Sequence, residues 1–145
     1  MSLQGKRVCI DPGHPSEVGI GTKGRRITEV KAAWEVALKL EKLLKDAGAE
    51  VKLTKGRERE KVLNRRRAEI ANAFEADIMV RLHCDSAAGT GFAVYYPTRQ
   101  GRANDGGIGP SQSVLTQCKL LAGKFYQGLS KATKGGPLKN RGLKS

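Results

Sequence analysis

The strongest constraint on the fold of this chain is a stripe of apolar residues at helical spacing. Thr28 is placed to cap the helix and Gly48 to end it. The stripe consists of Val30, Ala33, Trp34, Ala37, Leu40, Leu44 and Ala47. Strands are predicted on either side of this helix, over residues 8–10 and 51–54. This strand–helix–strand order predicts a βαβ crossover in a largely parallel sheet.

The rest of the chain continues the alternation of strands and helices. A second helix is expected over residues 60–74, with Leu63, Ile70 and Phe74 facing inward and its arginines facing outward. Further strands are predicted over residues 78–82 and 91–96, a third helix over 113–129, and loops over 15–26 and 97–110. We therefore expect one α/β domain over residues 1–145, a three-layer sandwich with helices on both faces of a mixed, mostly parallel sheet.

Composition narrows the class of protein. Of the 145 residues, 39% are hydrophobic, which fits a globular domain rather than a disordered chain. No apolar run approaches the ~20 residues of a membrane span, and the N-terminus lacks the basic-then-apolar pattern of a signal peptide. The three cysteines are too few and too scattered for a disulfide framework. Cys84 follows His83 directly, and neighbouring strand residues point to opposite faces, so its ligation of a metal is not favoured.

The formal net charge of +13 predicts a polyanionic partner. Nucleic acid is the first polyanion to consider, but the sequence has no zinc-finger spacing and no aromatic-rich RNA-binding strand. The basic residues are spread along the chain, apart from a run at residues 65–67 and a basic segment at 131–144. Nucleic acid is therefore the less favoured partner.

The two histidines of the chain both fall directly after predicted strands. Open α/β sheets carry their functional sites at that edge. Glu29 lies in the first turn of the long helix, where the helix dipole favours a carboxylate. If this helix begins at the same edge, His14, Glu29 and His83 converge. Two imidazoles and one carboxylate are a catalytic zinc set that leaves a fourth position for water.

These motifs resemble the zinc-dependent N-acetylmuramoyl-L-alanine amidases, a family of peptidoglycan hydrolases. The resemblance follows the order of the chain and is carried by Val8-Cys9-Ile10-Asp11-Pro12-Gly13-His14, Glu29 with Ala37 and Leu40, Leu53-Thr54, Ile70-Ala71-Asn72, Ala76-Asp77, His83, Ser113 with Leu121-Ala122, and Asn140-Arg141-Gly142-Leu143-Lys144. It implies a sheet of about six strands in the intact family, with zinc held by His14, Glu29 and His83. The implied reaction is hydrolysis of the amide between N-acetylmuramic acid and L-alanine.

The resemblance also implies partners and a place of action. Peptidoglycan and anionic wall polymers replace nucleic acid as the expected polyanions. The expected location is the bacterial cell envelope or the outside of the cell. Alternatively, the protein is a phage lysin. Two alternatives to an amidase stay open. The first is a non-catalytic module that binds cell wall or metal, and the second is a basic nucleic-acid-binding domain.

The sequence departs from the family pattern at the acid–base residue. The family's catalytic glutamate follows the Arg-Gly-Leu-Lys-like segment by some two dozen residues, so we expect this chain to lack it, together with the last strand and helix. Activity of the 145-residue chain is therefore expected to be weak. Asp85, which stands where the family usually has asparagine, and Glu17 are weak internal candidates for the missing role. Asp11, three residues before His14, is expected to orient a ligand histidine or to make a turn hydrogen bond.

Overall fold

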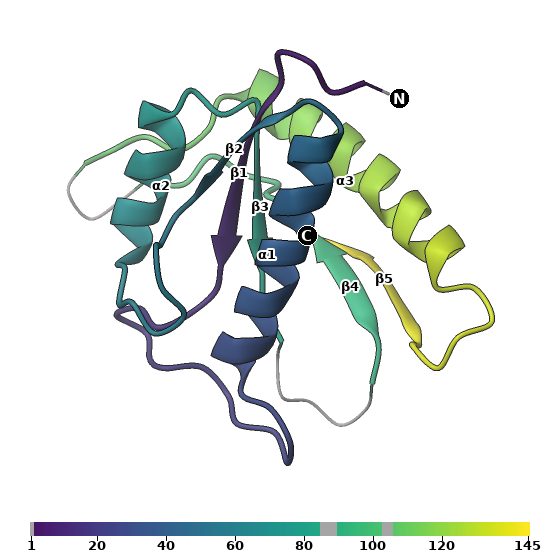
Figure 1. Ribbon diagram of the computed structural model, residues 1–145. Coiled ribbons are helices and arrows are strands. Elements are labelled where there is room, and N and C mark those ends of the chain that lie inside the picture. The colour runs from purple at the N-terminus through teal and green to yellow at the C-terminus, as the bar shows by residue number, and fades with distance from the viewer. Residues whose placement is uncertain (1, 85–89, 103–105) are drawn as a thin grey trace. The chain divides into compact units, whose positions relative to one another are not determined.

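A computed structural model describes residues 2–84, 90–102 and 106–145 (Figure 1). The chain divides into two compact units, Met1–Ser86 and Ala87–Ser145, and each unit is described by itself. The expectation of a single domain over residues 1–145 stays a prediction.

The first unit is a parallel α/β unit. Its elements in chain order are β1 (Arg7–Pro12), α1 (Glu29–Asp46), β2 (Glu50–Leu53), α2 (Asn64–Ala73) and β3 (Ile78–Leu82). The three strands form one sheet in the order β2-β1-β3, and β1 pairs in parallel with both neighbours. The predicted βαβ crossover and the α/β class are therefore confirmed.

The two helices of this unit cover opposite faces of its sheet. Val8 and Ile10 of β1 pack with Ala37 of α1 in the hydrophobic core. Side chains alternate along a strand, so Asp11, which follows Ile10, points to the other face. There it meets Arg67 of α2, which places α2 on the face away from α1. Figure 1 shows α1 on the near side of this sheet.

The long helix begins and ends where its caps predict. The Thr28 hydroxyl accepts a hydrogen bond from the Lys31 amide at 3.2 Å, which satisfies one of the free donors of the first turn. Gly48 follows the C-terminal cap with φ +95°, a conformation that favours glycine. Glu29 is consequently fixed as the first residue of α1.

Helix α2 differs from its prediction at three points. It begins at Asn64 rather than near residue 60, and Leu63 is its N-cap with half of the residue exposed rather than inward. The prediction that all arginines of this helix face outward is wrong for Arg67, which is 1% exposed. Its guanidinium is buried because it forms an ion pair with the buried Asp11 carboxylate.

The second unit contains β4 (Phe92–Tyr95), α3 (Gln112–Ala132) and β5 (Asn140–Lys144). The two strands pair in parallel, and α3 contacts both of them. Asn140 at the start of β5 donates to the hydroxyls of Tyr126 and Ser130 on α3, each at 3.0 Å. The sequence predicted β4 and α3. It did not predict β5, which lies within the basic segment at residues 131–144.

No helix among the described residues is long and apolar enough to cross a bilayer.

Candidate metal centre

His14 lies two residues beyond the end of β1. The Gly13 amide donates to the Leu82 carbonyl at 2.8 Å, which continues the β1–β3 pairing up to the histidine. His14 Nδ1 is 3.2 Å from the carbonyl oxygen of Gly19. A proton on Nδ1 is needed for that bond, so the other ring nitrogen, Nε2, is left as an acceptor. Nε2 lies 3.7 Å from Glu29 Oε1.

His83 follows β3 directly and approaches the backbone of Gly13 closely. A Cβ atom at residue 13 would lie 2.6 Å from His83 Cε1 and 2.7 Å from the Leu82 carbonyl oxygen. The site therefore requires glycine at this position. In the resulting arrangement His83 Nδ1 lies 2.9 Å from Glu29 Oε1.

Glu29 is held by hydrogen bonds to both carboxylate oxygens. Oε2 accepts from the Thr22 amide at 2.9 Å, and Oε1 accepts from the Cys84 amide at 3.1 Å. Burial acts to raise the pKa of Glu29, but hydrogen bonds from Thr22, His83 and Cys84 outweigh it, so the pKa lies below the ordinary glutamate value. The carboxylate is therefore ionised at neutral pH and available as a ligand.

The three predicted ligands come together in the structure. His14, Glu29 and His83 each offer a ligand atom, and these atoms lie within 4.8 Å of one another. The two imidazole rings meet edge to face, with centroids 4.9 Å apart. The Glu29 side chain is 2% exposed, whereas that of His83 is 34% exposed, so the cluster is buried on one side and accessible on the other. Two neutral imidazole nitrogens and one carboxylate are the donor set of a catalytic zinc site, and the residues present fit that ion.

The other sequence candidates have different surroundings. The Glu17 carboxylate accepts from the Asn64 amide at 2.9 Å, which caps the first turn of α2 and lowers the pKa of Glu17. Asp11 bonds to Thr54, Arg67 and Arg81, and the described contacts include none between its carboxylate and the His14 ring. Its carboxylate contacts α2 through Arg67, and the expectation that Asp11 orients a ligand histidine or makes a turn hydrogen bond stays a prediction. Asp85 lies outside the described residues.

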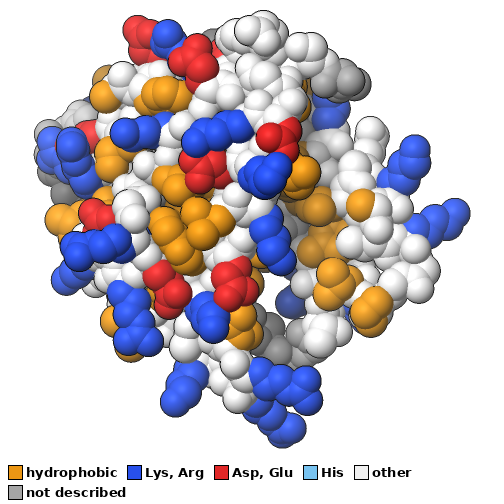
Figure 2. Space-filling view, viewed as in Figure 1, with side chains coloured by type: hydrophobic (Ala, Val, Ile, Leu, Met, Phe, Trp, Pro, Cys, Tyr) orange, Lys and Arg blue, Asp and Glu red, His pale blue; other side chains and the backbone are white. Residues whose placement is uncertain are grey.

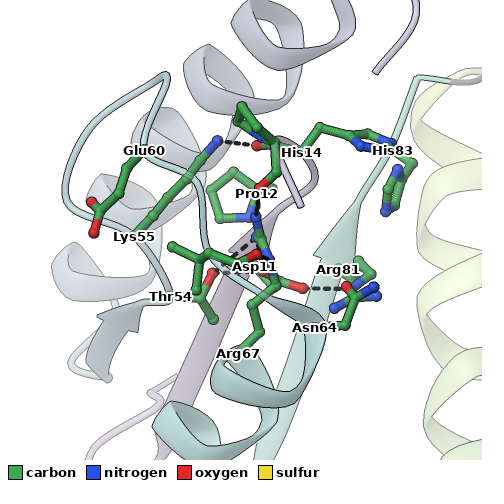
Figure 3. Close-up of polar contacts among 12 residues, drawn as sticks. Asp11, Pro12, His14, Thr54, Lys55, Glu60, Asn64, Arg67, Arg81 and His83 are labelled. Carbon is green, nitrogen blue, oxygen red and sulfur yellow. Dashed lines mark hydrogen bonds and ion pairs between the residues drawn. The ribbon is translucent and has the colours of Figure 1, made fainter. Parts of the chain in front are cut away.

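The sequence did not reveal two cations beside His14. Arg67 donates to the carbonyls of Pro12 and Pro15, at 2.7 and 3.0 Å, and Lys55 donates to the carbonyl of His14 at 2.5 Å (Figure 3). Arg67 stands in a run of three arginines, a pattern typical of a solvated helix face. The one sequence signal for the burial of Arg67 is Asp11, a charged residue in a buried strand that needs a cationic partner from the helix on its face of the sheet.

Fold and cluster together define a class of protein: a parallel α/β protein with a His–Glu–His cluster of potential metal ligands at the carboxyl edge of its sheet. The family model for N-acetylmuramoyl-L-alanine amidase matches residues 8–145. The chain belongs to the N-acetylmuramoyl-L-alanine amidase family, a family of hydrolases, as the motifs predicted.

Individual relatives agree with this membership. The N-acetylmuramoyl-L-alanine amidase CwlM of Mycobacterium tuberculosis is 34% identical over 100 residues, which cover 65% of this chain and 24% of CwlM. This chain thus spans about a quarter of the length of that relative. The catalytic domain of CwlV, an amidase from Bacillus (Paenibacillus) polymyxa var. colistinus, superposes with a TM-score of 0.69 at 27% identity, covering 96% of this chain and 69% of CwlV. AmiC2 of Nostoc punctiforme shares the fold, with a TM-score of 0.70 at 23% identity over 96% of this chain and 68% of that one.

Proposed function

We propose that this chain takes part in zinc-dependent hydrolysis of the amide that joins N-acetylmuramic acid to L-alanine in peptidoglycan. The observation that carries the proposal is the convergence of His14, Glu29 and His83 in a member of the amidase family. The same three residues were expected as ligands from their places after two strands and at the start of a helix.

The ligand atoms follow from the contacts of each side chain. His14 would bind through Nε2, because Nδ1 faces the Gly19 carbonyl. His83 Nδ1 donates to Glu29 Oε1 at 2.9 Å, and zinc would displace that proton and bind between these two atoms. A zinc ion held there would polarise the scissile carbonyl and lower the pKa of a water at the site toward ~7.

The remaining residues of the site keep these ligands in the right form. Amide donors at Thr22 and Cys84 keep Glu29 ionised and fix its direction. The Gly19 carbonyl selects the His14 tautomer that presents an acceptor nitrogen. Since the accessible side of the cluster is where His83 is exposed, the substrate amide would approach from there.

The proton for the leaving amine needs a further group. General acid catalysis contributes typically about 10²–10⁴-fold to the rate. Glu29 is not available as this acid, because its carboxylate belongs to the ligand cluster and both of its oxygens accept hydrogen bonds. We assign this role to a carboxylate outside the described cluster: Asp85, or a glutamate that in the family follows the segment matched by residues 140–144.

Cell-wall polymers are the proposed partners, and the bacterial envelope or a phage lysin is the proposed setting. The net charge of +13 supports attraction to anionic peptidoglycan and its associated polymers. Lys and Arg side chains are distributed among acidic and apolar ones over the face seen in Figure 2, which suits a broad polyanion better than a single compact anion.

Metal analysis and turnover test the proposal together. The wild-type chain should bind one zinc ion, and His14→Ala, Glu29→Ala and His83→Ala should each lose it. A variant that keeps full zinc stoichiometry would remove that residue from the ligand set. Product analysis on purified walls then separates an amidase, which releases stem peptides, from a non-catalytic module, which binds metal and walls without releasing any.

A further inference from the structure

The backbone at His14 is in an unfavourable conformation. Its φ is 50°, in the left-handed region that a residue with a side chain rarely adopts. Such a conformation persists only where the surrounding structure over-determines it. The contacts that hold His14 therefore matter for the direction of its ring.

Two cationic side chains hold this turn through its carbonyl groups. Arg67 binds the carbonyl of Pro12 on one side of His14 and that of Pro15 on the other, with Nη1 and Nη2 respectively. Lys55 binds the carbonyl of His14 itself. In Figure 3, Arg67 reaches the turn from α2, and Lys55 approaches it from the segment that follows β2.

Both cations are themselves fixed. Arg67 Nη1 donates to Asp11 Oδ1 at 2.5 Å, and its Nε donates to the Val62 carbonyl at 2.9 Å. Lys55 is 3% exposed, and its ammonium also donates to the Glu58 carbonyl at 2.8 Å. Its ammonium lies 5.7 Å from the centroid of the Trp34 ring. Anchored donors of this kind can impose a conformation on the turn rather than follow it.

We propose that Arg67 and Lys55 form a carbonyl clamp that positions His14 as a metal ligand, with Asp11 as the anchor of Arg67. The proposal rests on the proposed metal centre and assigns residues beyond its three ligands. A planar guanidinium suits the task because two of its nitrogens can reach two carbonyls at once, which a single ammonium in place of Arg67 cannot do in the same geometry. Neither residue touches the substrate in this proposal, so both are positioning residues.

Zinc affinity measured apart from stability tests the clamp. Wild type, Arg67→Lys and Lys55→Met of the full 145-residue chain are titrated with zinc against a chelating dye, and apo-protein stability is measured by urea unfolding. The expected result is a loss of zinc affinity of about 10–100-fold in either variant, the usual effect of removing a group that supports a ligand. Cobalt(II) in place of zinc should show an altered visible absorption spectrum in both.

Arg66→Lys is the matched control. Arg66 is the neighbour of Arg67 on α2, and its guanidinium pairs with the exposed Glu69. Its replacement should leave zinc affinity and the cobalt spectrum unchanged.

The outcomes separate the clamp from simpler roles. If Arg67→Lys and Lys55→Met lose apo-protein stability while zinc affinity and the cobalt spectrum match wild type, both residues are structural only and the proposal is overturned. Should Arg67→Lys fail to fold by circular dichroism, Lys55→Met decides, since a methionine fills the buried volume without a donor. A wild-type chain that binds no zinc would overturn the proposed metal centre first, and the clamp with it.

Discussion

Gly13 lies where the end of β1, the end of β3 and the proposed metal centre meet. Gly13 has no side chain, so the His83 ring can pack closely against its backbone. A Cβ atom built on residue 13 would lie only 2.6 Å from His83 Cε1. Gly13→Ala should therefore displace His83 or the Leu82 carbonyl, at a cost of about 1–3 kcal/mol of unfolding free energy. Zinc binding should weaken as well, because a ligand moves. Urea unfolding and zinc titration of the purified variant measure both effects.

Gly123→Ala is the control for this substitution. Gly123 lies within α3, and no described atom lies within 4 Å of its Cβ position. Alanine there should stabilise the helix by roughly 0.5–1 kcal/mol and leave zinc binding alone. Equal zinc affinity in Gly13→Ala and wild type would show that the close approach does not shape the centre.

The buried carboxylate of Asp11 gives stability a defined pH dependence. Burial acts to raise its pKa, but hydrogen bonds from Thr54 and Arg67 and the charges of Arg81 and Arg67 outweigh it, so the folded-state pKa lies below the ordinary value. The contribution of Asp11 is therefore complete above the unfolded pKa of about 3.9 and is lost as pH falls through the lower, folded pKa. Asp11→Asn should cost about 3–5 kcal/mol at neutral pH, because Arg67 loses its buried counter-charge.

Urea unfolding of the apo protein from pH 7 down to pH 3 checks this expectation. The difference between wild type and Asp11→Asn should be constant near neutrality and shrink in the acid range. A difference that grew as the pH fell would contradict the sign of the shift.

Among single residues, the sequence predicted those whose place relative to a strand end or a helix start determines where they lie in the fold. His14 and His83 follow strands and Glu29 opens a helix, so a parallel sheet brings them to one edge. Arg67 could not be predicted in this way, because its burial depends on which face of the sheet α2 covers. Periodicity within α2 is weak, and charge alone favours exposure there.

Among the helices and strands, those with strong local signals were predicted well. Helix α1 has a complete apolar stripe and both caps, and β3 is a short apolar run, so the predicted bounds agree closely with the structure. Strand β5 has the sequence Asn-Arg-Gly-Leu-Lys, which lacks the β-branched and aromatic residues typical of strands. It becomes a strand through pairing with β4 and contact with α3, neither of which is visible in the local sequence.

The N-cap of α1 links helix stability to the metal centre. Thr28 caps the helix whose first residue is Glu29. Thr28→Ala should cost about 1 kcal/mol of unfolding free energy, since the Lys31 amide loses its acceptor. Zinc affinity should fall only slightly, because the Thr22 and Cys84 amides still hold the Glu29 carboxylate. Thr28→Ser is the control and should retain most of the stability; a loss equal to that of alanine would exclude capping as the cause.

For the whole molecule, the net charge of +13 predicts salt-sensitive binding to cell walls. Attraction between exposed charges is screened within ~8–10 Å at ordinary ionic strength. The fraction of protein that sediments with purified walls should therefore fall steadily as salt is raised from low to high concentration. Walls stripped of their anionic polymers should retain less protein at low salt. Binding that is the same at every salt concentration would rule out the electrostatic account.

The activity of the chain tests the proposed division of labour between metal ligands and acid. Zinc held by His14, Glu29 and His83 would polarise the scissile amide, and the leaving amine would still need a positioned acid. A general acid contributes typically about 10²–10⁴-fold, so its removal should slow the release of stem peptides from purified walls by about that factor. Asp85→Asn is the discriminating variant, and its zinc stoichiometry is measured beside its turnover. A loss of that size with zinc retained would assign the acid to Asp85, whereas turnover equal to that of wild type would exclude Asp85 and assign the role to another carboxylate.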